Sequence, residues 1–579
     1  MRKFSDDQLD HAEAFSLNAG APLTAQFVIE DHALRHSWHH LAKIQVLWGI
    51  QEFYRVFSSV NGGRAIEPIC LKACVGDNMS LDDLRHRKAP LELSPEEFRT
   101  LGHRLIDRIA THFERIRERR VTPGETVEAV RQAIGASRSL PVSGSQSPDL
   151  LAEVTDILLD HSLFNAHPRF WGYITSGPAP IGVLADFVAS AVNPNVGAWK
   201  LAPAATEIEA QTVRWIAELI GYRADCGGLL VSGGNMANFV CFLTARRAQV
   251  QWNIREAGLA NNASRQLRIY ASTATHTWIQ KAADVFGHGT EAIRWIETDR
   301  ERMDPDALRR HVIRDCELGE QPFLVVGTAG TVSTGAVDPL AELGALCREY
   351  GLWFHVDGAY GAFAAKAPGG PPDLASLTDA DSVSVDPHKW LYTPLEAGCA
   401  LVRKPELLLD AFSYHPSYYH FEEEATNYFD LGLQNSRGFR ALKVWMALQQ
   451  AGQDGYLKMI GDDIRLARHL HSLASLHPEL EALSCGLSVT TFRYVPTEHR
   501  GRAGSAETEE YLNRLNRDIL SRIESGGEAF LSNAIIDGKF ALRACIVNFR
   551  TTLEDIEAVP ELVARVGRQA HAAASGNRS

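Results

Sequence analysis

The sequence lacks any uninterrupted apolar run long enough to cross a membrane, and its first residues contain no apolar signal core. It also lacks an excess of positive charge, because 58 lysines and arginines stand against 71 aspartates and glutamates, a net charge of −13. A chain with this charge is poorly suited to bind nucleic acid or an anionic membrane. We therefore expect neither as a partner.

Cysteine is sparse and scattered. Only Cys70 and Cys74 lie close together among the nine cysteines, and no Cys/His spacing matches a zinc site. An odd, dispersed set is typical of reduced thiols. We expect a soluble cytoplasmic protein without a disulfide framework. Repeats of fixed period, a Walker loop and a dinucleotide fingerprint are also missing, which argues against a solenoid and against those nucleotide sites.

The first 91 residues form an extension whose role the sequence does not reveal. An imperfect apolar stripe from Ala25 to Phe57 predicts one or two helices there. Such a helix would stack His32, His36 and His40 on one face, which either binds a metal or is an ordinary solvated or packed face. No carboxylate or cysteine ligand is evidently paired with them, and we predict no metal site.

Between about residues 175 and 400, apolar strands alternate with amphipathic helices. Strands are predicted at 228–231, 267–271, 292–296, 323–328, 352–356, 381–386 and 398–402. Helices are predicted at 208–221, 236–247, 279–286, 304–314 and 340–350. This alternation indicates an α/β fold with a mostly parallel central sheet covered by helices.

The remaining segments complete a four-part organisation. After the extension at 1–91, residues 92–175 are predicted to be a helical N-terminal segment, and 176–450 the large α/β domain. Strands and helices mix from 451 to 579, which predicts a small C-terminal α+β domain with a disordered tail.

Three shorter stretches carry further expectations. Ser94, with Glu97 three residues later, predicts a capped helix start. The aromatic cluster from His167 to Tyr173 fits either core or one wall of a substrate pocket. The aromatic, acidic stretch from Phe412 to Asp430 has no periodicity, which indicates a mobile loop.

One predicted strand leads directly to a lysine. Asp381 to Asp386 alternates small polar residues with valines, and Pro387 ends the strand. His388 and Lys389 follow at the sheet edge where α/β proteins bind ligands. A lysine here is either a solvated loop charge or an amine held for covalent chemistry.

A second strand, 352–356, ends at Asp357. A buried strand that delivers a carboxylate, followed by one that delivers a lysine, is the layout that a pyridoxal phosphate enzyme needs. The lysine forms the Schiff base and the aspartate pairs with the pyridinium nitrogen.

Other strand ends supply polar groups to the same edge. Gly234 and Asn235 lie in a turn before a helix, where backbone amides and the helix dipole favour an anion such as phosphate. His276 could cap a helix or stack on a planar cofactor ring, and Thr331 offers a hydroxyl group. Each of these also fits ordinary turn chemistry, but together they favour a cofactor crevice.

The chain resembles the group II pyridoxal phosphate-dependent amino acid decarboxylases, and most closely their aromatic-L-amino-acid decarboxylase branch. The resemblance covers about residues 92 to 568 and rests on several stretches. They are His167-Pro-Arg-Phe-Trp-Gly-Tyr173, Ala202-Pro-Ala-Ala-Thr-Glu-Ile-Glu209, Ser232-Gly-Gly-Asn-Met-Ala-Asn238, His355-Val-Asp-Gly-Ala-Tyr360, Asp386-Pro-His-Lys-Trp390, Arg437-Gly-Phe-Arg-Ala-Leu-Lys-Val-Trp445 and Leu542-Arg-Ala-Cys-Ile-Val-Asn-Phe-Arg-Thr-Thr552.

This resemblance implies the aspartate-aminotransferase fold, called fold type I, with pyridoxal 5'-phosphate as the cofactor. It implies a homodimer in which the 92–175 segment packs on the partner and active sites form at the subunit boundary. Lys389 would be the Schiff-base lysine, Asp357 the partner of the pyridine nitrogen and His276 the ring-stacking histidine. The other implied site residues are Gly234, Asn235 and His388 at cofactor-binding positions, Ala359 under the ring, Thr331 near it and Tyr418 as the loop proton donor.

Two departures from the family pattern concern the contact with the phosphate. Asp386 stands where the commonest form has asparagine, which affects the phosphate contact expected there. The phosphate turn has Gly-Gly-Asn where relatives often have serine or threonine, so backbone amides would carry more of the binding. In the loop, Tyr414 and Tyr419 flank Tyr418, and each fits the role of proton donor.

The predicted reaction is decarboxylation of an L-amino acid, with an aromatic side chain, to its amine and carbon dioxide. It would proceed through a Schiff base at Lys389 and a quinonoid protonated by Tyr418. Alternatives are an acidic substrate such as glutamate or aspartate, an aromatic aldehyde synthase, or another lyase or aminotransferase on this fold. Tyr418 argues against the synthase, in which it is typically phenylalanine, and Trp390 favours the aromatic branch.

Overall fold

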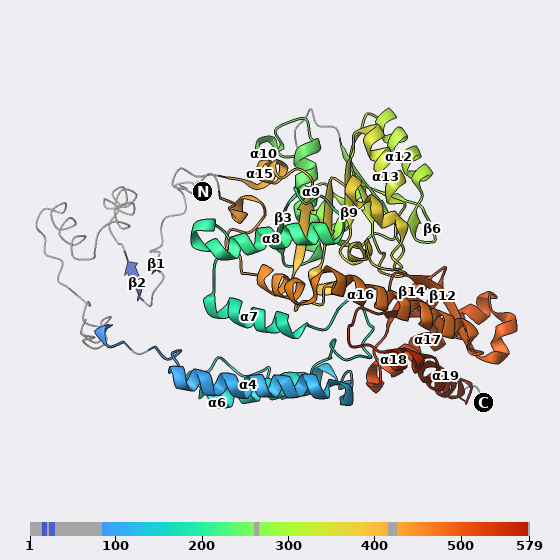
Figure 1. The fold of residues 1–579 in the computed structure, drawn as a ribbon, viewed down its shortest axis with the longest axis horizontal. Coiled ribbons are helices and arrows are strands. Elements are labelled where there is room, and N and C mark those ends of the chain that lie inside the picture. The colour runs from blue at the N-terminus through green and yellow to red at the C-terminus, as the bar shows by residue number, and fades with distance from the viewer. Residues whose placement is uncertain are drawn as a thin grey trace, which may run out of the picture. The chain divides into compact units, whose positions relative to one another are not determined.

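The computed structural model describes residues 84–87, 89–259, 266–414 and 425–576, together with the backbone of two strands nearer the N-terminus (Figure 1). The chain divides into two compact units, Met1–Thr100 and Leu101–Ser579. No helix within the described ranges is long and apolar enough to cross a membrane. The seven cysteines in those ranges are all free thiols.

The first unit contains an antiparallel hairpin of β1 (Ala14–Ala19) and β2 (Leu23–Val28). The prediction of a helix from Ala25 is therefore wrong for residues 25–28, where strand pairing supplies the backbone hydrogen bonds. Alternation of apolar and polar residues in Leu23-Thr-Ala-Gln-Phe-Val28 is the strand period. The rest of the predicted helix, with His32, His36 and His40, lies outside the described residues.

The predicted capped start at Ser94 is confirmed. Helix α4 (Pro95–Arg115) begins one residue later. The Glu97 amide donates to Ser94 Oγ over 3.2 Å, and the Ser94 amide donates to Glu97 Oε2 over 2.9 Å. This reciprocal pair satisfies two amides that the first helical turn would leave without partners.

The second unit is built on a sheet of seven strands, and the predicted α/β fold class is confirmed. In spatial order they are β3 (Gly227–Val231), β11 (Gly398–Val402), β10 (Ser382–Val385), β9 (Trp353–Asp357), β8 (Gln321–Thr328), β4 (Leu267–Ser272) and β5 (Ile293–Ile296). Only β11 runs antiparallel to its neighbours in this sheet. The carboxyl ends of the other six strands therefore meet at one edge.

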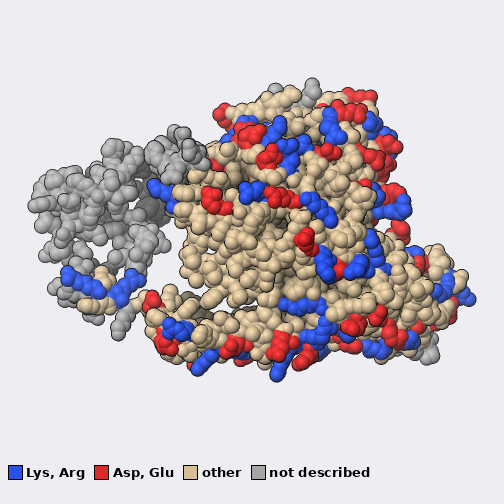
Figure 2. All heavy atoms as spheres, viewed as in Figure 1, with Lys and Arg blue, Asp and Glu red and all other residues tan. Residues whose placement is uncertain are grey.

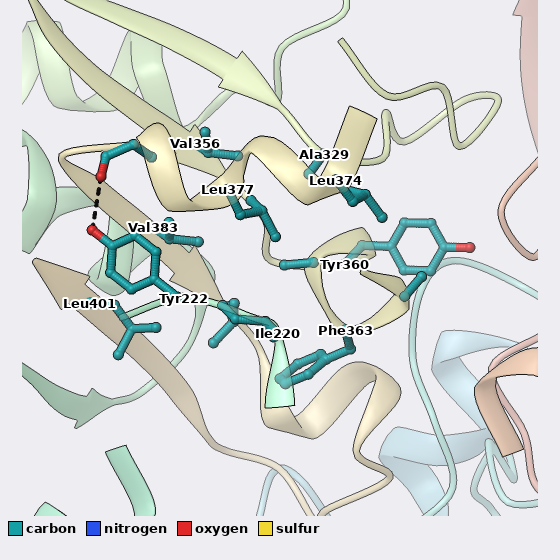
Figure 3. Close-up of a cluster of buried hydrophobic side chains, with 14 of the residues drawn as sticks. Ile220, Tyr222, Ala329, Val356, Tyr360, Phe363, Leu374, Leu377, Val383 and Leu401 are labelled. Atoms are coloured by element: carbon teal, nitrogen blue, oxygen red, sulfur yellow. Dashed lines mark hydrogen bonds between the residues drawn. The ribbon is translucent and has the colours of Figure 1, made fainter. Parts of the chain in front are cut away.

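Helices cover both faces of this sheet, and each face has its own hydrophobic core. The helices are α8 (Pro203–Leu219), α12 (Pro305–Glu317) and α13 (Leu340–Tyr350) on one face, and α9 (Gly234–Gln249) and α11 (Trp278–Val285) on the other. Figure 3 shows part of the first core, in which Val383 and Leu401 lie near Tyr222. The buried Tyr222 hydroxyl donates to the Ala380 carbonyl over 2.9 Å, so the ring is packed without leaving a polar group unsatisfied.

A smaller sheet follows in the C-terminal part of the chain. Its four antiparallel strands are β12 (Leu480–Gly486), β13 (Val489–Tyr494), β15 (Lys539–Cys545) and β14 (Ser532–Ile536), in that spatial order. Helices α17 (Ala506–Gly526), α18 (Leu553–Glu557) and α19 (Val559–Gly576) accompany it, and α17 and α19 contribute to a third core. Helix α16 (Ala441–Leu476) runs from the large core to this one and is broken at Gly452, whose φ is 66°.

Several helices and short elements remain. They are α5 (Val127–Ala133), α6 (Ser147–Asp160), α7 (Pro180–Val192), α10 (Ile254–Ala257), α14 (Pro387–Trp390), α15 (Glu406–Phe412), β6 (Thr298–Asp299) and β7 (Arg302–Met303). Helix α7 is almost entirely apolar apart from Asp186 and Ser190, so it shows none of the periodicity by which helices are found in a sequence.

Candidate active site

A cavity of about 170 Å³ opens at the edge where the parallel strands end. Its walls come from the ends of β8, β9 and β10, the first turns of α9 and α14, and the loop before α11. The lining residues are Ile174, Gly234, Asn235, Asn238, Ala274, His276, Thr328, Gly330, Val332, Asp357, Ala359, Tyr360, Asp386 and Lys389. Six of the residues predicted from the sequence thus meet in one place: Gly234, Asn235, His276, Asp357, Ala359 and Lys389.

Lys389 enters the cavity from the short helix α14. Pro387 opens this helix, where its missing amide costs nothing, directly after β10. The Lys389 Nζ atom lies 3.0 Å from Oδ2 of Asp386, and the Asp386 side chain is buried. The amine is therefore held by one carboxylate and partly exposed to the cavity.

Asp357, at the end of β9, accepts hydrogen bonds from four donors. Trp278 Nε1 and Asn238 Nδ2 reach Oδ2 over 2.7 and 3.3 Å. The Ala359 amide and Ser384 Oγ reach Oδ1 over 3.2 and 3.3 Å. These contacts come from four separate segments, so the carboxylate has a fixed position in the cavity wall.

A chain of buried donors lies behind Asp357. Burial lowers the pKa of His355 to about 4, so its ring is neutral and has one donor and one acceptor nitrogen. His355 Nε2 contacts Asn238 Oδ1 over 2.8 Å, and Nδ1 contacts Ser382 Oγ over 2.9 Å. Trp353 Nε1 donates to Ser382 Oγ over 2.9 Å. Donation then runs in one direction, from Trp353 through Ser382, His355 and Asn238 to Asp357.

His276 lies in the loop between β4 and α11, with its ring exposed where it borders the cavity. Its Nδ1 atom accepts from the Trp278 amide over 3.3 Å, which fixes the ring. Desolvation lowers the pKa of His276, and the nearby Asp357 carboxylate opposes that shift. The ring that borders the cavity is therefore neutral at physiological pH.

Gly234 begins α9, and no side chain among the described residues caps that helix. Its first amides point to the cavity edge with the positive end of the helix dipole, which suits an anion such as phosphate. A Cβ atom on Gly234 would lie 2.7 Å from Asp386 Oδ2 and 3.3 Å from the Ala359 Cβ. Glycine is therefore required for this close approach.

The stretches that contain Glu209 and Arg437 meet in a buried ion pair outside the cavity. Arg437 bonds both oxygens of Glu209, and it also donates to the Leu230 carbonyl over 2.5 Å. Glu209 Oε1 accepts from the Leu230 amide over 2.8 Å. The pair thus fixes the end of β3 immediately before the Gly234 turn.

Three predicted residues lie elsewhere or are not described. The Thr331 hydroxyl contacts Glu301 Oε2 over 2.9 Å and does not line the cavity. His388 lies just behind the wall, with Nε2 3.8 Å from Asp386 Oδ2 and its pKa lowered by burial. Tyr418, like Tyr419, lies outside the described residues. Tyr414 lines a different pocket, where the Arg255 guanidinium lies 3.9 Å above its ring.

The aromatic cluster from His167 to Tyr173 serves mainly as core. Phe170 and Trp171 are buried, and Trp171 Nε1 donates to Thr551 Oγ1 over 3.2 Å. Ile174, the next residue after the cluster, lines the cavity. The described residues contain no group of three or more His, Cys, Asp or Glu side chains that could hold a metal.

The site has the parts that pyridoxal phosphate requires: a lysine amine, an opposed carboxylate, a neutral histidine ring and an uncapped helix start beside glycines that leave room for the phosphate. Together with the mostly parallel sheet, they define an enzyme of fold type I. Gly234 supports the fit of the phosphate to this site. A side chain there would contact Asp386 and Ala359 and occupy the space at the start of α9.

The comparisons with known proteins agree. Residues 132–494 match the family described as "Pyridoxal-dependent decarboxylase conserved domain", and the chain belongs to that family. An aromatic-L-amino-acid decarboxylase of Bacillus atrophaeus is 33% identical over 80% of this chain and 94% of its own length. A phenylacetaldehyde synthase of a Rosa hybrid cultivar is 29% identical over 80% of this chain and 93% of its own length.

Solved structures give the same result for the fold. Oryza sativa TDC, determined with PLP and tryptamine, superimposes with a TM-score of 0.76, is 25% identical and covers 83% of this chain and 99% of its own. Rhodiola rosea 4-hydroxyphenylacetaldehyde synthase gives a TM-score of 0.72 with 26% identity over 83% of this chain and 99% of its own. The protein is accordingly a pyridoxal phosphate-dependent carboxy-lyase acting on an amino acid.

Proposed function

We propose that the enzyme decarboxylates an aromatic L-amino acid to the corresponding amine. The observation that carries this proposal is the composition of the cavity wall. Lys389 is the sole lysine or arginine among the described lining residues, and Ile174, Val332 and Tyr360 give the wall an apolar, aromatic character. A second carboxylate on the substrate would lose its hydration there without gaining a cation as a partner. An aromatic side chain would instead gain apolar contacts.

The relatives support the same substrate class. Besides the Bacillus atrophaeus protein, tyrosine decarboxylases 3 and 4 of Petroselinum crispum are each 28% identical to this chain. Each match covers 83% of this chain.

In the proposed site, Lys389 supplies the amine that binds the cofactor and releases it to the substrate. Asp357, whose position is fixed by its four donors, would pair with the pyridine nitrogen of the cofactor. The negative charge of Asp357 would keep that nitrogen protonated. The cofactor supplies the electron sink for the bond that breaks. His276, with its neutral ring, and Ala359 would hold the cofactor ring between them.

The phosphate in this proposal lies at the start of α9. The amides of Gly234 and Asn235 would bind it, with His388 behind them. Thr331 would lie near the ring, because its neighbours Gly330 and Val332 line the cavity. Tyr418 is the proposed donor of the proton that replaces the lost carboxyl group. A phenol group next to the substrate can act as a general acid and donate this proton.

The relatives also favour one second candidate. Two aldehyde synthases are similar to this chain, at 29% and 26% identity. An aldehyde synthase removes carbon dioxide as well but forms an aldehyde, ammonia and hydrogen peroxide with oxygen. The carbon skeleton of the substrate is then the same and only the fate of the amine differs.

The test is a product assay on the purified full-length enzyme with L-DOPA, tyrosine, tryptophan, glutamate and aspartate. We expect one amine for each carbon dioxide from an aromatic substrate. Aldehyde with peroxide in place of amine would favour the synthase, and turnover confined to glutamate or aspartate would refute the aromatic assignment.

We propose further that two copies form a homodimer. Helix α7 exposes Leu184, Val188 and Val192, of which 48%, 48% and 70% is accessible. Figure 2 shows few charged side chains over the part of the surface where α7 lies. An apolar face of this kind, on a helix of the unit that contains the active site, is typical of a subunit interface.

The proposal includes the division of the chain that the sequence predicts. Residues 92–175 would pack on the partner subunit, 176–450 would form the cofactor domain and 451–579 the small domain. Helix α16 crosses the boundary between the last two, and its break at Gly452 lies next to that boundary.

A further inference from the structure

Asp386 is placed where a carboxylate is difficult to explain in a loaded enzyme. Only 1% of the residue is exposed. Its Oδ2 atom lies 3.0 Å from Lys389 Nζ, whereas Oδ1 is buried and has no hydrogen-bond partner in the described part of the chain. A buried carboxylate oxygen without a donor is costly unless something binds to it.

The same carboxyl group borders the anion cradle. A Cβ atom built on Gly234 would lie 2.7 Å from Oδ2, so the carboxyl group and the first residue of α9 are in close contact. Gly234, Asn235 and Asp386 line one cavity. A phosphate bound at the start of α9 would therefore lie beside Asp386. Two neighbouring anions repel each other strongly where water is excluded.

The charges facing Asp386 can be stated for every element around it. From α14 come Lys389 at 3.0 Å and His388 at 3.8 Å, and burial keeps His388 neutral by lowering its pKa. From the loop before α11, His276 also has a lowered pKa, and from β11 the Cys399 thiol has a raised one, both through burial. Helix α9 contributes Gly234 and Asn235, which do not titrate. Lys389 is thus the one charged partner among the described residues.

Loading the cofactor removes that partner. The Lys389 ammonium must first give up a proton, and its nitrogen then bonds to the aldehyde carbon while the aldehyde oxygen leaves as water. The ion pair with Asp386 is lost in this step, and the phosphate arrives at the same time. An ionised Asp386 would then face the phosphate without the ammonium group that had paired with it.

We propose that Asp386 accepts a proton when the cofactor binds and that the neutral carboxyl group donates its O–H to the phosphate. The Lys389 ammonium, 3.0 Å away, is the nearest proton source. The transfer converts ammonium and carboxylate into amine and carboxylic acid, and so frees the nucleophile while it makes the cradle neutral. Wild type then keeps on Asp386 a proton that a chain with asparagine at this position must release to solvent when Lys389 reacts.

This inference rests on the cofactor and not on the identity of the substrate. It is tested by measuring bound pyridoxal phosphate in the full-length chain at equilibrium with free cofactor, between pH 6 and pH 9 (a range of about three units). Wild type is compared with Asp386→Asn and with Asp381→Asn, which removes the carboxyl group at the opposite end of β10.

We expect the affinity of wild type to fall by up to about tenfold for each unit of rising pH relative to Asp386→Asn, because wild type keeps on Asp386 the proton that the variant must release when Lys389 reacts. Asp381→Asn should follow wild type. With pyridoxal, which forms the same bond to Lys389 but has no phosphate, the difference between wild type and Asp386→Asn should disappear. Parallel curves for the two proteins with pyridoxal phosphate would overturn the proposal, as would weaker binding by Asp386→Asn at every pH.

Infrared spectroscopy of wild type provides an independent measurement that needs no variant. Loading the ¹³C-aspartate-labelled chain with pyridoxal phosphate should produce the carbonyl band of a protonated carboxylic acid, and loading with pyridoxal should not. A spectrum without this band refutes the proton on Asp386. An enzyme that still releases carbon dioxide from amino acids in that case would leave the proposed function intact.

Discussion

At the scale of single residues, the site depends on how Asp357 is held. Its donors come from α9, α11, β10 and the turn after β9, and the neutral His355 sits behind Asn238. Each donor in this chain has one acceptor, so no member can turn without breaking a buried hydrogen bond. The charge opposite Lys389 is therefore placed by packing and needs no rearrangement when the cofactor binds.

Replacing Lys389 by alanine tests the covalent role of the amine. We expect Lys389→Ala to lose the visible absorbance of the covalently bound cofactor and at least about 10³-fold in decarboxylation rate, since no other described lysine borders the cavity. Absorbance spectroscopy and carbon dioxide release check both. Lys458→Ala, which removes an exposed lysine on α16, is the matched control. A retained absorbance band in Lys389→Ala would show that another lysine binds the cofactor.

At the scale of elements, a buried carboxyl group joins α16 to the segment that carries Lys389. Asp463 Oδ2 accepts from Trp390 Nε1 over 2.9 Å and from the Tyr392 hydroxyl over 2.8 Å. Burial raises the pKa of Asp463 to about 7, although both hydrogen bonds oppose that shift. The short helix α14 is thus fixed from behind by a group that titrates near neutral pH.

Asp463 should make the stability of the folded chain depend on pH. Its pKa is raised from an ordinary value of about 4, so its stabilising contribution is complete below about pH 4 and is lost as the pH rises to about 7. Relative to Asp463→Asn, the free energy of unfolding of wild type should fall across this window by an amount on the order of 1–4 kcal/mol, and stay level above it. Denaturant titrations at a series of pH values measure this difference.

The neighbouring carboxyl group provides the control for that experiment. The pKa of Asp462 is lowered, because Lys458 and Arg465 contact it and outweigh its partial burial. Asp462→Asn should therefore run parallel to wild type between about pH 5 and pH 7. The interpretation of Asp463 fails if both variants give the same curve.

Elements with a clear period could be predicted from the sequence, and those without one could not. In β10, Val383 and Val385 face one core while Ser382 and Ser384 face the other side, and this alternation was visible in advance. Helix α7 was missed because it is apolar nearly all round. Strands β12 and β14 were missed because pairing with β13 and β15, and not a local pattern, makes them strands.

The same limit applies to the site. Lys389, Asp357 and Gly234 could be predicted because each follows directly after a strand and the ends of parallel strands meet. Trp278, Asn238 and His355 escaped notice because their roles arise from contacts between residues far apart in the chain. The position of Asp386 against both Lys389 and Gly234 likewise appears only in three dimensions.

At the scale of the whole molecule, the apolar face of α7 stands out, because within the described ranges of one chain it stays exposed. Leu184, Val188 and Val192 follow one another at intervals of four residues, which places them on one side of the helix. Inside the unit, the same helix is tied to α16 by the ion pair of Asp186 with Lys443, over 3.0 Å. A second copy that covers this face would therefore contact a helix that is linked, through α16, to the core next to the site.

The substitution Val188→Asp tests whether this face joins two subunits. A carboxylate buried in an apolar interface without a partner should weaken association at least about a hundredfold. Sedimentation velocity over a range of concentrations should find a dimer for wild type and a monomer for Val188→Asp. Leu318→Asp places the same charge at an exposed apolar residue at the end of α12 and should remain a dimer.

If the active site is completed at the subunit boundary, the activity of Val188→Asp per chain should also rise with protein concentration as dimers form. A monomer that is fully active at every concentration would contradict a shared site. An unchanged dimer in Val188→Asp would place the interface on another face of the unit.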